Sequence, residues 1–229
     1  MASSVAGHKR AFGADVVPGC YEDFELADLI VLVGSNTAYC HTVLYQRILS
    51  ARERRPEMKI VVVDPRHTPT RDVADLHLPI RAGSDVRLFS GLLVYLHRHG
   101  LSDQRFLTEH TADAEVALAA AQSCAGNIED VAQACGVDAQ RLEAFYALFA
   151  RTERVVTAFS QGVNQSSAGT DKVNSILNCH LLTGRIGRPG MGPFSLTGQP
   201  NAIGGREVGG MASMLAAHME LGDPQPRAL

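Results

Sequence analysis

The chain has 229 residues, of which 45% are hydrophobic, and this length allows one large domain or two small domains with a buried core. Its formal net charge is −3, so it lacks the excess of basic residues that a nucleic-acid partner would require. No apolar run approaches the roughly 18 residues of a membrane span, and no export signal is visible, so we expect a cytoplasmic protein without membrane partners.

The first half of the chain alternates short apolar runs with helical patterns. Residues 29–33 form a continuous apolar run that ends at Gly-Ser-Asn, which is typical of a buried parallel strand. A helix is expected from about residue 38 to residue 54. The next apolar run, residues 60–63, ends in Asp-Pro-Arg, where the proline excludes further helix or central strand. A shorter strand is expected within residues 75–80.

The second half is richer in helical patterns. Leucines at helical spacing follow residue 85, and Ser84 or Asp85 is the expected N-cap of that helix. Residues 102–150 carry helical patterns throughout, and we expect them to pack through leucine, phenylalanine and tyrosine side chains. A strand at 155–159 and a helix at 170–183 complete the alternation. Strands alternating with helices predict an α/β fold, a doubly wound and mainly parallel sheet with helices on both faces.

A glycine- and arginine-rich stretch, residues 184–210, follows the last expected helix. It holds nine of the 21 glycines and three arginines against one acid. This composition predicts a loop outside the core that wraps a bulky anion with backbone N–H groups and arginine side chains. A flexible linker is the alternative, but linkers rarely carry residues such as Met191 and Phe194. We therefore expect a Rossmann-like domain over 1–183 and a Gly/Arg-rich loop segment over 184–229.

Polar turns follow the expected strands, and the carboxyl ends of parallel strands meet at one edge of a sheet. Gly34, Ser35 and Asn36 precede a helix and could present backbone N–H groups to a phosphate. This signal is weak alone, because strand-to-helix turns also need glycine for steric reasons. The other turns lie at residues 64–68, 83–85 and 161–165.

Asp64 and Arg66 are the most specific residues of these turns. The carboxylate could accept hydrogen bonds from a guanine or a ribose, and the guanidinium could stack on a base or bind phosphate. The alternative is a turn that the Asp64 side chain and Pro65 stabilise, just as Asp85 could serve only as a helix cap. Their occurrence after successive strands favours a nucleotide-containing ligand.

Several common site patterns are absent from the sequence. The turn after residue 33 lacks the Gly-x-Gly-x-x-Gly of NAD-binding proteins, and there is no Walker loop and no Gly-x-Ser-x-Gly elbow. The five cysteines form no Cys-x-x-Cys pair, which argues against a zinc or iron–sulfur site within the chain. We therefore assign no metal ligand to these residues and expect reduced, mostly buried thiols.

The same motifs resemble the molybdopterin oxidoreductase family and, within it, the catalytic subunits of bacterial assimilatory nitrate reductases. The resemblance covers essentially the whole chain. Its most specific block is Thr183-Gly-Arg-Ile-Gly-Arg-Pro-Gly-Met-Gly-Pro-Phe-Ser-Leu-Thr-Gly-Gln-Pro-Asn201, followed by Gly205-Arg-Glu-Val-Gly209. The supporting blocks are residues 33–36 with His41, 64–68, 83–85 and 162–171.

The resemblance implies a molybdenum cofactor held as two molybdopterin guanine dinucleotides, with nitrate reduced to nitrite. Carried over by position, the turn at 34–36 would meet a pyrophosphate, and Gln199 and Arg206 would lie near the metal and the nitrate. The other implied cofactor-binding residues are Asp64, Arg66 and Thr68, then Gly83, Ser84 and Asp85 at a guanosine end, and Gln161, Asn164 and Gln165 at the pterin or its phosphate.

The chain departs from the family pattern at its start. The family's molybdenum-binding cysteine would immediately precede Met1, which would stand at the substrate pocket. A [4Fe–4S] segment would lie further upstream. The resemblance therefore implies an internal fragment, inactive alone, whose partners are the remaining domains of the parent subunit and an electron donor. Two alternatives stay open: a self-standing, non-catalytic cofactor- or nucleotide-binding module, and a fragment of a related formate dehydrogenase-like enzyme.

Overall fold

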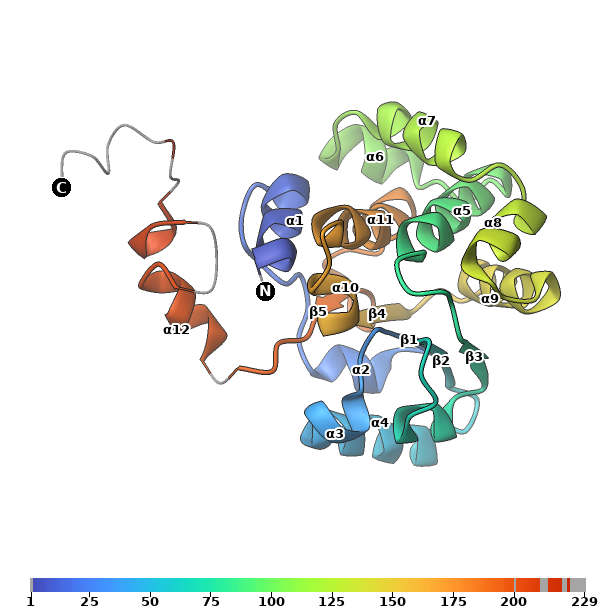
Figure 1. Cartoon of the computed structure of the whole chain (residues 1–229), viewed down its shortest axis with the longest axis horizontal. Coiled ribbons are helices and arrows are strands. Elements are labelled where there is room, and N and C mark those ends of the chain that lie inside the picture. The colour runs from blue at the N-terminus through green and yellow to red at the C-terminus, as the bar shows by residue number, and fades with distance from the viewer. Residues whose placement is uncertain (1, 200, 211–213, 220–221, 223–229) are drawn as a thin grey trace.

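A five-stranded parallel sheet forms the centre of the molecule (Figure 1). The computed structural model describes residues 2–199, 201–210, 214–219 and 222. The sheet order is β3-β2-β1-β4-β5. Its strands are β1 (Leu29–Val33), β2 (Lys59–Val63), β3 (Leu76–Leu78), β4 (Val155–Phe159) and β5 (Gly192–Ser195). The chain reverses its direction of winding between β1 and β4, so the expected doubly wound α/β fold is confirmed.

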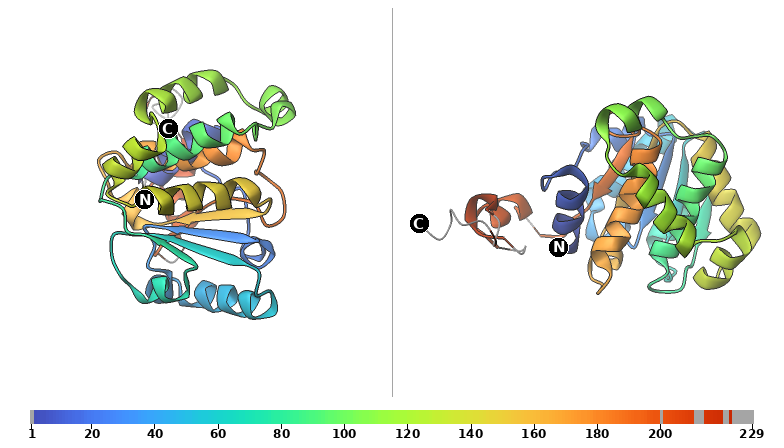
Figure 2. Two further views of the ribbon diagram at one scale, coloured as in Figure 1. Left: turned by 90° about the vertical axis from the view of Figure 1, so that its right-hand side faces the viewer. Right: turned by 90° about the horizontal axis from the view of Figure 1, so that it is seen from above.

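Successive side chains of the central strands β1, β2 and β4 enter two separate apolar layers, because side chains alternate across a strand. In β1, Ile30 and Leu32 pack against α2 (Glu22–Leu26) and α4 (Thr42–Arg54). Leu29, Val31 and Val33 face the opposite layer. That layer includes α5 (Asp85–Arg98), α9 (Ala139–Arg151) and α11 (Gly169–Leu182). Figure 2 shows helices on both sides of the sheet.

The helical region between α5 and β4 forms as expected. It consists of α6 (Gln104–His110), α7 (Ala114–Cys124), α8 (Ile128–Cys135) and α9. The side chains of Asp103, Asn127 and Asp138 each accept a backbone N–H from the residue three positions later, at the starts of α6, α8 and α9. Such caps satisfy N–H groups that have no partner within the helix.

Three local expectations need correction. The helix expected over 38–54 is two helices, α3 (Thr37–Cys40) and α4, because His41 between them has a non-helical φ of −139°. Ser84 holds the N-cap position of α5, but its hydroxyl donates to the Arg81 carbonyl instead of capping the helix. A further helix that was not expected, α1 (Ala2–Phe12), packs against α11 beside the sheet (Figure 1).

The Gly/Arg stretch is partly core, contrary to expectation. β5 pairs with β4 inside the sheet, and Met191 and Leu196 on either side of it are buried. A domain boundary at residue 183 would therefore separate β5 from the sheet to which it belongs. After β5, the short helices α12 (Ala202–Glu207) and η2 (Ala216–His218) lie beyond α1, outside the sheet and its helices (Figure 1). Two short helices, α10 (Gln161–Asn164) and η1 (Pro69–Val73), follow β4 and β2.

Candidate functional site

The turns after β1 and β4 touch each other at the carboxyl edge of the sheet. Gly34 has a φ of +54°, and a Cβ on it would lie 2.8 Å from the Cα of Gly162. The Gly162 N–H donates to the Gly34 carbonyl at 3.0 Å. Both glycines are thus required by the contact between the two turns, which lies at the point where the strand order reverses.

Ser35 and Asn36 take part in hydrogen bonds within the protein. The Ser35 hydroxyl lies 2.9 Å from the Thr37 hydroxyl, and Asn36 Oδ1 accepts from the Thr70 hydroxyl at 3.1 Å. Thr70 also accepts the Ala38 N–H at 3.0 Å. These bonds hold the start of α3 against η1 and fix the shape of the turn.

Asp64 is buried directly after β2, and its carboxylate binds Arg66. It accepts the Arg66 backbone N–H at 2.9 Å and the guanidinium Nε and Nη2 at 3.1 and 3.2 Å. Asp64 thereby raises the pKa of Arg66, whose side chain is 61% exposed. This is the geometry of the turn-stabilising alternative, yet the face of the guanidinium stays open to a ligand. Thr68 is half-buried, and its carbonyl accepts the Arg71 N–H at the start of η1.

Asp85 forms a buried ion pair that the sequence analysis did not predict. Its carboxylate lies 2.7 Å from Lys172 Nζ, with side-chain exposures of 8% and 4%. Lys172 also donates to the Gly162 carbonyl at 3.4 Å, so α11 is tied to the turn after β4. A lysine next to Val173 on the buried side of a predicted helix was the available signal. Gly83, with a φ of +90°, forms the exposed turn before the pair.

The turn after β4 carries an amide that binds nothing in the described part of the chain. Asn164 is 2% exposed, and neither its Oδ1 nor its Nδ2 has a hydrogen-bond partner there. A buried polar group without a partner costs about 1–3 kcal/mol, so such a group suggests a missing ligand or water. Gln161 is half-buried and Gln165 is exposed on the same short segment.

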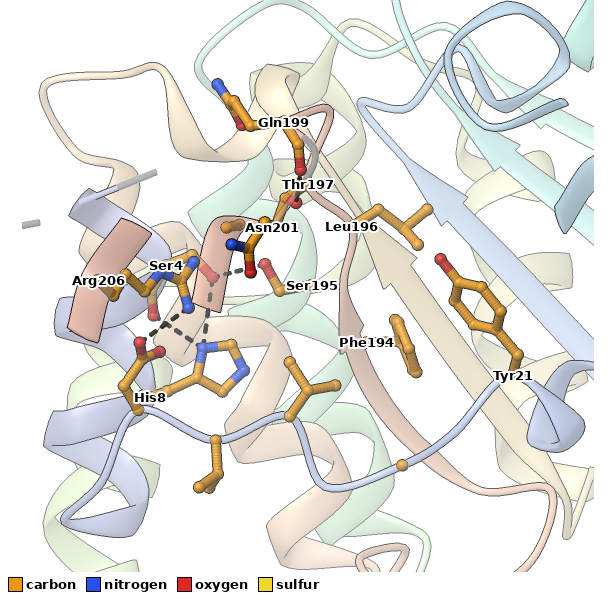
Figure 3. Close-up of a pocket in the computed structure, with 15 residues that line it drawn as sticks. Ser4, His8, Tyr21, Phe194, Ser195, Leu196, Thr197, Gln199, Asn201 and Arg206 are labelled. Atoms are coloured by element: carbon orange, nitrogen blue, oxygen red, sulfur yellow. Dashed lines mark hydrogen bonds and ion pairs between the residues drawn. The ribbon is translucent and has the colours of Figure 1, made fainter. Parts of the chain in front are cut away.

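A hollow of about 640 Å³ opens between α1, the connection to α2, the end of β5 and α12. Its two ends differ in character (Figure 3). Ser4, His8, Ser195, Asn201 and Arg206 gather at a polar end, whereas Tyr21, Phe194 and Leu196 form an apolar end. Gln199 also lines the hollow, so the structure brings together the two described residues for which the resemblance implied a catalytic role.

Arg206 is paired with a residue that the sequence analysis did not identify. Its guanidinium lies 2.8 Å from the carboxylate of Asp15, and both side chains are at most 7% exposed. Beside them, the Ser4 and Ser195 hydroxyls are 2.5 Å apart. Nothing in the local sequence distinguishes Asp15, because its partner lies 191 positions away.

The end of the Gly/Arg stretch and the strand turns share one edge of the sheet. His41 Nε2 is 2.8 Å from the Thr197 carbonyl, and the Ser160 hydroxyl donates to the Leu196 carbonyl at 3.2 Å. Arg185 lies elsewhere, because it donates to the Thr152 carbonyl before the start of β4. The expectation that all three arginines of the stretch meet one ligand is therefore wrong for Arg185, and also for Arg188, whose guanidinium lies 3.9 Å from the Asp103 carboxylate at the start of α6.

Met1 lies outside the described residues. Within the described part of the chain, His, Cys, Asp and Glu side chains do not gather in groups of three that could hold a metal ion. Across those same residues, no helix is long and apolar enough to cross a bilayer. The expectation of mostly buried thiols is wrong: Cys20 and Cys40 are exposed and Cys124 is half-buried, whereas Cys135 and Cys179 are buried and their pKa values are raised by burial.

The chain is similar in sequence to several known proteins. A model of the molybdopterin oxidoreductase family matches residues 2–227. A nitrate reductase of Klebsiella oxytoca is 53% identical over 96% of this chain, and one of Shewanella frigidimarina is 50% identical over 100%. A periplasmic nitrate reductase of Desulfovibrio desulfuricans is 34% identical over 100% of the chain. The chain spans only 24% of the first two relatives and 31% of the third.

A solved structure has a similar fold. The acetylene hydratase from Pelobacter acetylenicus superimposes with a TM-score of 0.70 over 80% of this chain and 24% of its own, at 20% sequence identity. At that identity the likeness concerns the fold alone.

Proposed function

The chain belongs to the molybdopterin oxidoreductase family, and from this premise we propose that it is the cofactor- and nitrate-binding part of a molybdenum-dependent nitrate reductase. The observation that carries the proposal is its similarity, over nearly its whole length, to proteins named nitrate reductase. Because the chain spans about a quarter of those relatives, the reaction is proposed for the whole protein. An electron donor, an iron–sulfur cluster and further domains would complete it.

The residues of the carboxyl edge fit a large phosphate-bearing cofactor. The buried Asn164 amide lacks a partner among the described residues, the Arg66 guanidinium is exposed, and the turn at Gly34 is followed by the start of α3. We propose that the cofactor is molybdopterin guanine dinucleotide. The guanosine end would meet Asp64, Arg66 and Thr68, and the pterin would meet the segment 161–165.

The remaining assignments concern the second half of the guanosine end and the reaction itself. That end would also include Gly83, Ser84 and Asp85. The Asp85 carboxylate is bound to Lys172, so Asp85 would position the turn and not contact the guanosine itself. When bound, the cofactor supplies the redox chemistry and the oxygen-atom transfer. The protein would bind and orient nitrate at the polar end of the hollow, where Arg206 can match two oxygens of a planar oxyanion and Gln199 can donate a hydrogen bond.

We further propose that the reductase is assimilatory and cytoplasmic. Of the relatives described above, those named only nitrate reductase are more identical to this chain than the periplasmic one. Fractionation of cells that express the full-length protein tests this, and activity in the periplasmic fraction would contradict it.

Two measurements test cofactor binding. Elemental analysis and mass spectrometry of the purified chain should find molybdenum or a pterin.

In a calorimetric titration with guanosine diphosphate, Arg66→Ala should weaken binding about tenfold, a loss of about 1.4 kcal/mol, because it removes the exposed guanidinium. Arg206→Ala is the matched control and should leave binding unchanged, because Arg206 lies in the hollow. Equal losses in the two variants would show that the assigned roles are wrong.

A further inference from the structure

His8 is a buried histidine in the wall of the hollow, on the second turn of α1. Its Nδ1 lies 2.7 Å from the Ser4 carbonyl oxygen. Because a carbonyl can only accept, Nδ1 must carry the proton, and in a neutral ring Nε2 is then a bare acceptor. Nε2 is buried and has no hydrogen-bond partner among the described residues. The imidazole therefore has a nitrogen, Nε2, that could accept a proton beside the polar end of the hollow (Figure 3).

The surroundings of His8 determine its charge. The pKa of His8 is lowered overall: burial lowers it most, the hydrogen bond to the Ser4 carbonyl and the Asp15 carboxylate raise it, and the Arg206 guanidinium lowers it further. From α1 itself the ring contacts Phe12 and the Ser4 hydroxyl, and from β4 the Phe159 ring stacks on it at 6.2 Å; none of these three groups is charged. At neutral pH the group of three is electrically balanced, with a neutral His8 and an Asp15–Arg206 pair.

This balance conflicts with anion binding by Arg206. The guanidinium is 6% exposed and already bound to Asp15, so an added monovalent anion would give this buried site a net charge of −1. An uncompensated buried charge is costly, and a proton is the simplest compensation. The bare His8 Nε2 is the proton acceptor that the site provides, and its protonated form would give Asp15 a second cationic partner.

We propose that the hollow takes up a small monovalent oxyanion together with one proton, the anion on Arg206 and the proton on His8 Nε2. The proton comes from solvent, and the site stays neutral before and after binding. The inference rests on the proposed function when the anion is nitrate. The reduction of nitrate to nitrite and water consumes two protons with two electrons, so the site would deliver one of these protons with the substrate.

Proton uptake can be counted on the unmodified chain. Nitrate is titrated calorimetrically at pH 7 in HEPES and in Tris, whose ionisation enthalpies differ and neither of which is a small oxyanion, and the difference between the apparent enthalpies gives the protons bound per nitrate. We expect close to one. His8→Phe, which keeps an aromatic ring against Phe159, should reduce uptake to near zero and weaken nitrate binding about tenfold. His110→Gln is the control, because His110 is exposed on α6, and its uptake should match the wild type.

A second readout does not depend on a variant. Nitrogen-15 NMR of the histidine side chains should show His8 Nε2 gaining a proton when nitrate is added at pH 7. Nitrate binding without proton uptake, an unchanged His8 signal, or no nitrate binding at millimolar concentration would each overturn the inference. Guanosine diphosphate titrated in parallel separates the two proposals: if it binds while nitrate takes up no proton, the proposed function stands and this inference fails.

Discussion

Two buried arginine–histidine pairs in the described part of the chain differ in place, one sealed in the core and one beside the hollow. Arg185 and Arg206 come from the same Gly/Arg stretch and are 7% and 6% exposed. Each guanidinium lowers the pKa of a buried histidine, Arg185 that of His180 and Arg206 that of His8. In both histidines burial is the larger cause of the shift.

The two pairs differ in what surrounds them. The Arg185 guanidinium lies 4.9 Å from the centre of the Phe149 ring and donates to the Thr152 carbonyl, while His180 Nε2 lies 2.8 Å from the Thr157 hydroxyl of β4. Arg206 has a carboxylate partner and lines the hollow. Packing around an arginine therefore distinguishes an arginine that fills the core from one that lines a hollow, where composition cannot.

The largest expected effect comes from the sealed pair. Arg185→Ala should lower the free energy of unfolding by about 3 kcal/mol, because it leaves a cavity against Phe149 and the Thr152 carbonyl without its donor. Urea denaturation measures this. Arg188→Ala is the matched control, since the Arg188 side chain is 55% exposed in the same loop and should cost little. Equal destabilisation by the two substitutions would contradict the comparison.

The second-largest effect should come from acid, which should lower the free energy of unfolding through His180 of the sealed pair. Burial lowers the pKa of His180 from 6.5 to about 3, so the unfolded chain binds this proton at higher pH than the folded chain does. Stability is therefore fully present above about pH 7.5 and falls as the pH drops towards 3, by about 2 kcal/mol from this group at pH 5. Urea denaturation at pH 7.5 and 5 measures the loss. His180→Gln should reduce the difference by that amount, and an unchanged difference would refute the assignment.

The smallest effect on global stability should come from the pair beside the hollow. Arg206→Ala deprives Asp15 of its partner, and the unpaired carboxylate should move to solvent and release α12. Because α12 lies outside the sheet and its helices, we expect a change of about 1 kcal/mol or less in the free energy of unfolding. Limited proteolysis should instead show several-fold faster cleavage within residues 197–210. Arg185→Ala should not accelerate that cleavage in its folded fraction, and equal acceleration would remove the distinction between the pairs.

Much of the fold followed from local patterns. The continuous apolar runs at 29–33 and 155–159 predicted buried parallel strands, and the alternation with helices predicted the doubly wound sheet. The strand within the Gly/Arg stretch was missed because Gly192-Pro-Phe-Ser195 carries no apolar run of its own. β5 is held in the sheet by pairing with β4, which is a tertiary contact.

The residues that could bind a ligand can be predicted from the sequence alone, because side-chain chemistry and strand periodicity are local properties. Which of these residues meet depends on the packing of distant segments. This packing sets Gly34 against Gly162, Asp85 against Lys172 and Arg206 against Asp15, and it places Arg185 at the other edge of the sheet. Such pairs join segments far apart in the chain, and the burial that gives His8 and His180 their lowered pKa values exists only once those segments have packed together.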